Sequence, residues 1–467
     1  MSFLSPLFLL LLGVCLLSLR LPARRRWMLL LPASWFFYAC HHVALLGLLL
    51  LVTLVSYACA LRMARLEDGR RRRRALAAGL GVCFGLLFVF KYLDFTVLGF
   101  CSLLRAVGVS CGFAGFGLLL PMGISFYVFQ TASYLVDVYR GDVPAERHFG
   151  YYALFVSFFP QLVAGPIERS GDLLPALRSP RTPDAREVAE GLRDMVRGFA
   201  KKVMVADLLS GYVDAAYGAP QQAGGVALML ATVLFALQIY CDFSGYTDIA
   251  RGCARLLGVR LTQNFRQPYR AVTIRDFWRR WHISLTRWFT DYVYIPLGGR
   301  YRGRARQCFN ILVVFLASGL WHGADITFVI WGLLHGVYLV CETLLGGRAD
   351  RLPRGLRRCL TLGLVCFAWI FFRAEGLDNA LAVLRTIVGN PAPTQWLTGL
   401  GLTPAELPLL CGLMALVPLL DRLPALETGR ERSGGVLVYF LLITALLVCR
   451  CLTLLQGASP AFIYFQF

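Results

Sequence analysis

The sequence predicts an all-α integral membrane protein that crosses the bilayer many times. Its 467 residues are 57% hydrophobic, and the apolar residues gather into runs close to the twenty residues that a helix needs to span a bilayer. A soluble chain of this length would instead divide into two or three domains. We expect about eleven spans, with further re-entrant and interfacial helices, in a single transmembrane domain over residues 1–467.

The first apolar run, residues 3–19, is expected to be a retained membrane helix. Its positive residues follow it, at 20–26, whereas a cleaved secretory signal carries them in front. The next basic cluster, at 62–74, is expected on the same cytoplasmic side because of the positive-inside rule. The chain between these clusters must then cross an even number of times, and residues 27–40 and 43–61 form the expected hairpin. This places the N-terminus outside.

The later apolar runs are of more than one kind. Those at 115–139 and 149–166 carry Gly, Pro and polar residues at mid-depth, and irregular backbone there is tolerated only where protein or a water-filled cavity covers it. Residues 184–203 instead predict an amphipathic helix at the membrane surface, opened by a capping box of Asp184 and Glu187. The spans expected after the hairpin are residues 75–97, 115–139, 149–166, 222–243, 308–321, 324–346, 356–372, 404–423 and 435–456, with a polar break at 424–434.

Charge and cysteine usage exclude other classes of protein. The net charge is +20, but the arginines stand between apolar runs and form no domain of their own. Nucleic acid is therefore not an expected partner, and the expected partner of the basic residues is the lipid bilayer. Most of the 15 cysteines lie inside apolar runs, as buried free thiols do. A disulfide framework or a zinc site is not expected, and no residues have metal-ligand spacing.

Candidate binding residues surround His282. A helix should begin near Ile274, because Thr273 and Asp276 have the spacing of an N-terminal cap. It is expected to continue through His282, with one apolar stripe formed by Trp278, Trp281, Leu285 and Trp288. Arginine pairs with phosphate oxygens and stacks on planar rings, so the segment suits a phosphorylated, adenine-bearing ligand. From spacing alone, an interfacial helix with an aromatic belt is slightly favoured over this interpretation. The candidate ligand-binding side chains are Arg275, Arg279, Arg280, Trp278 and Trp281.

His322 is the candidate general base. It closes the apolar run 308–321, and an ionisable side chain at that depth is expensive, so it suggests a functional site. A neutral imidazole can take and return a proton near neutral pH. The competing interpretation is a histidine that makes one hydrogen bond between helices, and His335 on the next run is equally open to that interpretation.

A third polar group lies near the end of the run 222–243. Its two carboxylates and its hydroxyls must face protein or water. They could orient a histidine or shape a tunnel, or they could form a polar helix end capped against Arg251. The group consists of Gln238, Tyr240, Asp242, Ser244, Tyr246 and Asp248.

Taken together, these stretches resemble the membrane-bound O-acyltransferase family, and within it the membrane subunits of alginate-type O-acetyltransferases. The resemblance extends over most of the chain in the right order, and residues 264–299 and 319–336 are its most specific parts. The matching stretches are LPMGISFYVFQTASYLVDVYRG (120–141), FFPQLVAGPIER (158–169), GFAKKV (198–203), DFSGYTDIARG (242–252), NFRQPYRAVTIRDFWRRWHISLTRWFTDYVYIPLGG (264–299), GLWHGADITFVIWGLLHG (319–336) and the terminal FIYFQF.

The resemblance implies a ring of membrane helices around a thin floor pierced by a tunnel. It implies that an acyl group, most simply acetyl from acetyl-CoA, passes from a cytoplasmic thioester donor to a hydroxyl of an extracytoplasmic polysaccharide or acyl-relay protein. The histidine of the WHG motif, His322, is then the catalytic residue, and His282 of the RRWH motif is the second signature residue, with a role in donor binding or positioning. No permanently bound cofactor is implied.

The same resemblance implies a multi-pass protein of the bacterial inner membrane. Two alternatives stay open at this point. One is a transferase of D-alanyl or other acyl groups to teichoic acid or another cell-wall polymer, with a carrier-protein thioester as donor. The other is a transporter or flippase, whose polar residues at mid-membrane would form a permeation site.

Overall fold

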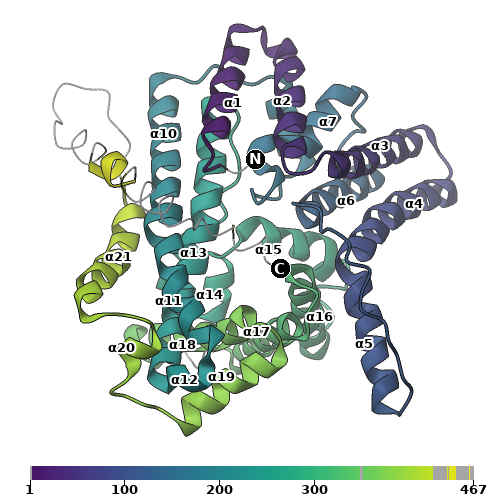
Figure 1. Ribbon diagram of the computed structural model, residues 1–467. Helices are drawn as coiled ribbons and strands as arrows, with labels where there is room; N and C mark the ends of the chain where they lie inside the picture. Colours follow the sequence, from purple (N-terminus) through teal and green to yellow (C-terminus); the bar gives the residue numbers. More distant parts are fainter. Residues whose placement is uncertain are drawn as a thin grey trace. The chain divides into compact units, whose positions relative to one another are not determined.

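The structure is a computed structural model that describes residues 3–347, 351–423, 439, 441–446, 448 and 462. All regular secondary structure in that part of the chain is helical, without any strand (Figure 1). The predicted all-α class is therefore confirmed. The chain forms two compact units, Met1–Gly191 with Ala250–Thr262, and Leu192–Ile249 with Gln263–Phe467.

Five helical segments of the described chain are long and apolar enough to cross a membrane. They support a multi-pass membrane protein, while the larger number of spans stays a prediction. The expected span 435–456, the polar break 424–434 and the terminal motif lie almost entirely outside the described residues. The five segments are Val43–Arg65, Gly69–Ala106, Gly225–Leu256, Ile326–Leu345 and Arg354–Arg373.

In the first unit, the chain turns between two helices at the place where the sequence predicts the N-terminal hairpin, while the crossing of the membrane by both arms stays a prediction. The two arms are the second and third helices, which are separated by residues 40–42. The third, fourth and sixth helices pack against one another. The helices of this unit are α1 (Pro6–Leu16), α2 (Trp27–Ala39), α3 (Val43–Arg65), α4 (Gly69–Leu87), η3 (Phe88–Tyr92), α5 (Leu93–Ala106), α6 (Ile124–Arg140), α7 (Phe149–Ser157), α8 (Phe159–Leu162) and α9 (Ser170–Arg178), with short turns η1 (Leu17–Arg20) and η2 (Ala23–Arg25).

The predicted irregular backbone is present in this unit. The run 115–139 is helical only from Ile124, and the run 149–166 is broken at Phe158. Gly123, at φ +72°, lies so close to the Leu162 carbonyl that a Cβ there would collide with it, so this position requires glycine. The amide of Gln130 donates to the Phe155 carbonyl at 2.7 Å, which satisfies an acceptor next to the break.

The expectation of free thiols is wrong for one pair. Cys101 on α5 and Cys111 form a disulfide, with their Cα atoms 5.4 Å apart. The physical reason is that residues 107–123 are not helical and fold back along α5. The Asp94 carboxylate accepts hydrogen bonds from the Phe116 and Gly117 amides at 2.8 and 3.3 Å, which holds the returning chain beside the helix.

The second unit contains the remaining helices. Two boundaries between the units fall within α10 and α13, and the third falls between Thr262 and Gln263, outside any helix. The Tyr217 and Thr232 hydroxyls, on two helices of this unit, are bonded at 2.8 Å. The helices of the unit follow in chain order. They are α10 (Ala185–Phe199), η4 (Ala200–Ala206), α11 (Asp207–Gly218), α12 (Pro220–Ala223), α13 (Gly225–Leu256), η5 (Pro268–Arg270), α14 (Ile274–Trp278), α15 (Ile283–Phe289), η6 (Thr290–Tyr294), α16 (Arg304–His322), α17 (Ile326–Leu345), α18 (Arg354–Arg373), α19 (Leu377–Gly389), α20 (Trp396–Gly399), η8 (Pro404–Glu406) and α21 (Leu407–Leu420).

The amphipathic helix at 184–203 begins as predicted and then departs from the prediction. The capping box forms, since Glu187 N–H donates to Asp184 Oδ1 at 2.7 Å. In its second half, however, the polar face is covered: Asp194 is fully buried, whereas the apolar Leu192 is 42% exposed. Burial of charge there is tolerated because each group has an ionic partner, so this half of α10 packs into the protein rather than presenting its charges to the membrane surface.

Candidate active site

His322 is held at the end of α16 by a close contact between two helices. α16 packs along α17, and the backbones approach at Gly319 and Gly332, where a Cβ would collide with the carbonyls of Phe328 and Phe315. Glycine is needed at such a crossing because it has no side chain to separate the backbones. The motif residue Gly323 then ends the helix in extended conformation, which fixes His322 at the turn.

The surroundings of His322 are aromatic and closed to solvent. Its side chain is 3% exposed. Ring centroids of Trp331 and Phe372 lie 4.9 and 5.4 Å from the imidazole centroid. The second motif histidine, His282, lies 6.4 Å away by the same measure, so the fold brings together two residues that the sequence analysis had selected separately.

His282 occupies a break in the backbone. The sequence predicted one helix through this residue, and that is wrong: α14 ends at Trp278, and His282 adopts a left-handed conformation with φ +43° before α15 begins. The break is anchored by Asn264, whose backbone and side-chain oxygens accept hydrogen bonds from the Ile283 and Ser284 amides, each at 3.0 Å. The predicted helix start at Ile274 is confirmed, with Asp276 N–H donating to Thr273 Oγ1 at 3.0 Å.

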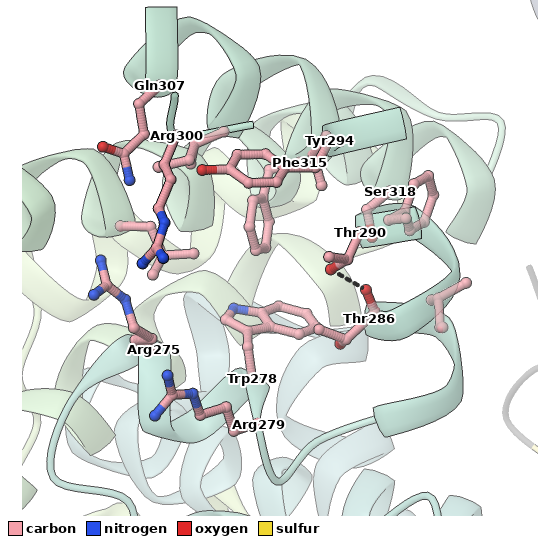
Figure 2. A pocket seen from close by; sticks show the side chains of 15 residues that line it. Arg275, Trp278, Arg279, Thr286, Thr290, Tyr294, Arg300, Gln307, Phe315 and Ser318 are labelled. Carbon is pink, nitrogen blue, oxygen red and sulfur yellow. Dashed lines mark hydrogen bonds between the residues drawn. The ribbon is translucent and has the colours of Figure 1, made fainter. Parts of the chain in front are cut away.

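A cavity of about 450 Å³ lies beside this break. Figure 2 shows the guanidinium groups of Arg275, Arg279 and Arg300 gathered at one end, Ser318 at the other, and Trp278 between them. Ser318 is one helical turn before His322, a rise of about 6 Å along the axis. The cavity therefore has a basic end and an end on the helix that carries His322, while neither His282 nor His322 is among its lining residues.

Residues 145–377 match the model of the MBOAT, membrane-bound O-acyltransferase family. A protein named probable alginate O-acetylase from Azotobacter vinelandii is 43% identical over 380 residues, which are 80% of this chain and 74% of the relative. The chain belongs to the membrane-bound O-acyltransferase family.

Two further relatives have other names. A peptidoglycan O-acetyltransferase from Helicobacter pylori is 35% identical over 393 residues, 78% of this chain and 73% of that protein. A teichoic acid D-alanyltransferase from Bacillus subtilis is 25% identical over 271 residues, 54% of this chain and 69% of that protein. The chain is thus an O-acyltransferase of the membrane, and an acyl donor is its substrate.

In this acyltransferase the five candidate binding residues separate into two groups. Arg275, Trp278 and Arg279 line the cavity. Arg280 is turned toward Asp276, with which its Nε bonds at 2.7 Å. Trp281 is 1% exposed and stacks on Phe277 at 5.5 Å between ring centroids, so it supports the wall of the site rather than facing the cavity.

The structure adds lining residues that the sequence analysis did not select. Arg300 and Gln307 join the basic end, and Thr286, Thr290 and Tyr294 line the wall. Thr290 opens the π-helical turn η6, and such turns are frequent at functional sites. The run of arginines after residue 299 was the one signal in the sequence that pointed to this part of the lining.

His335 has a visible structural contact. It is fully buried on α17, and Trp278 Nε1 donates to its Nδ1 at 3.3 Å. This bond joins α14 to α17 and so fixes the tryptophan that forms the middle of the cavity wall. The interpretation of His335 as a histidine that bonds between helices agrees with this contact.

The carboxylates of the polar group at 238–248 pair with basic residues of α10 and η4. Asp242 bonds to Lys202 at 2.6 Å, and Asp248 bonds to Arg197 and Lys201 at 2.7 and 3.2 Å. Between these carboxylates, Phe243 packs edge-on against His282 at 4.8 Å. The charges therefore hold α13 in place, and an aromatic residue of the same helix contacts the histidine.

Proposed function

We propose that this acyltransferase moves an acetyl group from acetyl-CoA on the cytoplasmic side to a hydroxyl of an extracytoplasmic polysaccharide or of an acyl-relay protein. The relatives named for alginate and for peptidoglycan O-acetylation support acetyl as the group and a polymer as the final acceptor. Arg275, Arg279, Trp278 and His322 are the residues on which the proposal depends.

The observation that carries the proposal is the cavity that has three guanidinium groups at one end and Ser318, one helical turn before His322, at the other. Charge-assisted bonds from arginine forks suit the phosphates of a nucleotide-bearing thioester. The apolar wall of Trp278, Leu285 and Phe315 suits an extended apolar arm, and Ser318 lies near the place where the thioester must react. The same cavity could not serve a small uncharged donor as well, because its arginines would be left without an anion.

His322 acts as general base in the proposed reaction. One imidazole nitrogen takes the proton of the acceptor hydroxyl while the hydroxyl oxygen attacks the thioester carbonyl carbon. The carbon–sulfur bond then breaks, and the leaving thiolate takes the proton back from the imidazolium. Holding both reactants in one enclosed site supplies much of the acceleration, and the aromatic surroundings keep out water that would hydrolyse the thioester.

His282 is proposed to position the site. Its ring lies against Phe243, Trp321 and the His322 ring, at 4.8, 5.8 and 6.4 Å between centroids. Its left-handed backbone also places the chain turn that separates the cavity wall at Trp278 from that at Leu285. Both effects act on the geometry around His322, and the two roles can be separated by substitution.

The larger architecture belongs to the proposal as well. About eleven spans form one domain over residues 1–467, arranged as a ring around a tunnel in the inner membrane of a bacterium. The N-terminus lies outside, and the arginines at 20–26 and 62–74 lie inside. The basic end of the cavity then opens to the cytoplasm, where acetyl-CoA is made.

A second candidate is transfer of a D-alanyl group from a carrier-protein thioester, favoured by the teichoic acid D-alanyltransferase among the relatives. Its lower identity and shorter matched length rank it below O-acetylation. A transporter is excluded as the main function, because the chain belongs to an acyltransferase family.

One experiment tests the proposal and separates the candidates. The purified full-length protein in proteoliposomes receives acetyl-CoA labelled in the acetyl group, or a D-alanyl carrier protein with the same label, together with a soluble polysaccharide or a partner protein as acceptor. We expect label in ester linkage on the acceptor with acetyl-CoA, and none with the His322→Gln variant. Ester formation from the carrier protein alone would transfer the assignment to the second candidate.

A further inference from the structure

A second cavity, of about 300 Å³, lies in the same unit as the cavity of about 450 Å³ proposed above for the acyl donor, which we call the donor cavity. The two cavities share no lining residue. The lining of the second cavity is mainly polar, whereas the lining of the donor cavity is largely apolar. The four basic side chains of the second cavity outnumber its two carboxylates. The lining consists of Arg197, Lys201, Tyr240, Ser244, Asp248, Gln263, Phe265, Arg266, Gln267, Arg280 and Asp421.

The two carboxylates already have cationic partners. Asp248 accepts two bonds from Arg197, at 2.7 and 2.9 Å, and one from Lys201 at 3.2 Å. Asp421 pairs with Lys201 at 2.7 Å and accepts a bond from the Tyr240 hydroxyl at 2.8 Å. Neutralised in this way, the carboxylates do not repel an anion as free ones would, and they do not form a site for a cation.

Several hydrogen-bond donors in the lining of this second cavity remain available to a ligand. The Ser244 hydroxyl is 1% exposed and has no hydrogen-bond partner in the part of the chain that the structure describes, which is costly for a buried hydroxyl unless something fills the cavity. The guanidinium of Arg266 makes no side-chain bond to any described residue. Arg280 uses its Nε on Asp276, and a terminal nitrogen makes only a long 3.4 Å contact with the Arg266 carbonyl.

We propose that this cavity binds a phosphate group. Phosphate carries several oxygens that each accept bonds, which matches a lining rich in guanidinium, hydroxyl and amide donors. The volume of about 300 Å³ suits a phosphate group, alone or in a lipid headgroup. Inorganic phosphate and the phosphate of an anionic phospholipid are the two sources of this one chemistry.

The wall of this cavity is in packing contact with the active site through aromatic side chains. Phe265, in its wall, packs edge-on against Trp281 and against Phe243, each at 5.0 Å between ring centroids. Phe243 in turn contacts the His282 ring at 4.8 Å. A bound phosphate therefore lies one aromatic layer from His282, and it ties the chain before α14 to the helix pair that carries Arg197 and Asp248.

Binding is tested on the full-length protein without reference to acyl transfer. The melting temperature of the purified protein in a neutral detergent is followed while inorganic phosphate is titrated against chloride at constant ionic strength. The same measurement is made in nanodiscs of phosphatidylglycerol and of phosphatidylcholine. The variants are Ser244→Ala and Arg266→Gln, with Arg304→Gln as a matched control, because Arg304 is exposed and lines neither cavity.

We expect phosphate to raise the melting temperature of the wild type and of Arg304→Gln. The loss of one charge-assisted bond in Arg266→Gln should raise the phosphate concentration required roughly tenfold. Stabilisation only by phosphatidylglycerol, and lost in both variants, would assign the site to the lipid headgroup and also supports the proposal. No stabilisation by either source, or an equal one in Arg266→Gln, would overturn it, whether or not the protein transfers acetyl groups.

Discussion

Replacement of His322 by glutamine separates a catalytic from a structural histidine. Glutamine keeps a polar end that can donate and accept hydrogen bonds, but it cannot carry a proton near neutral pH. If His322 is the general base, its loss should slow acyl transfer by about 10²–10⁴-fold. That range corresponds to about 2.7–5.5 kcal/mol in the activation barrier.

The structural cost of the same change follows from the surroundings of the ring. The imidazole packs against Trp331 and Phe372, and each such aromatic contact contributes about 0.5–1.5 kcal/mol. Glutamine fills much of the same space, so we expect a loss of about 1–3 kcal/mol in stability. This lowers the melting temperature, but it does not by itself remove the folded state at assay temperature.

The matched control is His335→Gln on the neighbouring helix. His335 is fully buried, as His322 nearly is, and it accepts a hydrogen bond from Trp278 Nε1. The glutamine carbonyl can accept that bond, so this variant should lose stability of the same order and keep most of its transfer rate. The comparison therefore removes the effect of changing a buried histidine.

Both variants are measured for melting temperature, for binding of a non-transferable acetyl-CoA analogue, and for single-turnover transfer of labelled acetyl. We expect His322→Gln to bind the analogue with near-normal affinity and to lose transfer. A folded His322→Gln protein that transfers at a rate near that of His335→Gln would refute the reasoning. An equal loss in both variants would show that the site is sensitive to packing and not to proton transfer.

The remaining predictions concern the donor, the topology and the buried charges. Arg279→Ala should weaken donor binding roughly tenfold or more, as expected for the loss of one charge-assisted bond to phosphate. Arg280→Ala should weaken donor binding less, because that guanidinium is bonded to a neighbouring carboxylate. Isothermal titration with the acetyl-CoA analogue measures both affinities, and if both variants bind it as tightly as the wild type, the arginines are only a belt at the membrane surface. Reporter fusions at Ser2, which lies outside the described residues, and at Gly69 should report opposite sides of the membrane, and the same side for both would contradict the proposed topology. Lys201→Met takes from Asp421 its cationic partner, whereas Asp248 keeps Arg197, and should cost about 3–5 kcal/mol, seen as a lower melting temperature; an unchanged value would mean that Lys201 contributes little to the network.

Local signals in the sequence predicted local structure well. The caps at Asp184 and Thr273 form with the predicted bonds, because a side-chain oxygen that accepts from a backbone N–H three residues later needs no tertiary information. The turn of the N-terminal hairpin and the broken run at 149–166 were also predicted, since Gly and Pro act on the backbone at their own position. Each of these features depends on residues within one turn of one another.

Features that depend on distant neighbours were not predicted. Helical periodicity carried the stripe of tryptophans through His282 without interruption, whereas the structure breaks the helix there, with Asn264 bonding to the two residues that follow. The charged face of α10 was also predicted wrongly, because its pattern of charges fits a helix at a membrane surface. Only the partner on α13 shows that Arg197 and Asp248 face each other inside the protein.

The break at His282 also explains why the arginines next to it cannot be assigned from sequence. In an unbroken helix, Arg279 and Arg280 would lie about 100° apart on one surface, and both would reach the same ligand. In the structure the two adjacent side chains line different cavities: Arg279 the donor cavity and Arg280 the polar one. A left-handed histidine between two short helices thus divides one basic cluster between two sites. The substitution that tests this is His282→Asn, because asparagine tolerates the left-handed backbone and removes only the ring. If the backbone is what separates the two arginines, this variant keeps donor affinity while it loses whatever the imidazole contributes to transfer.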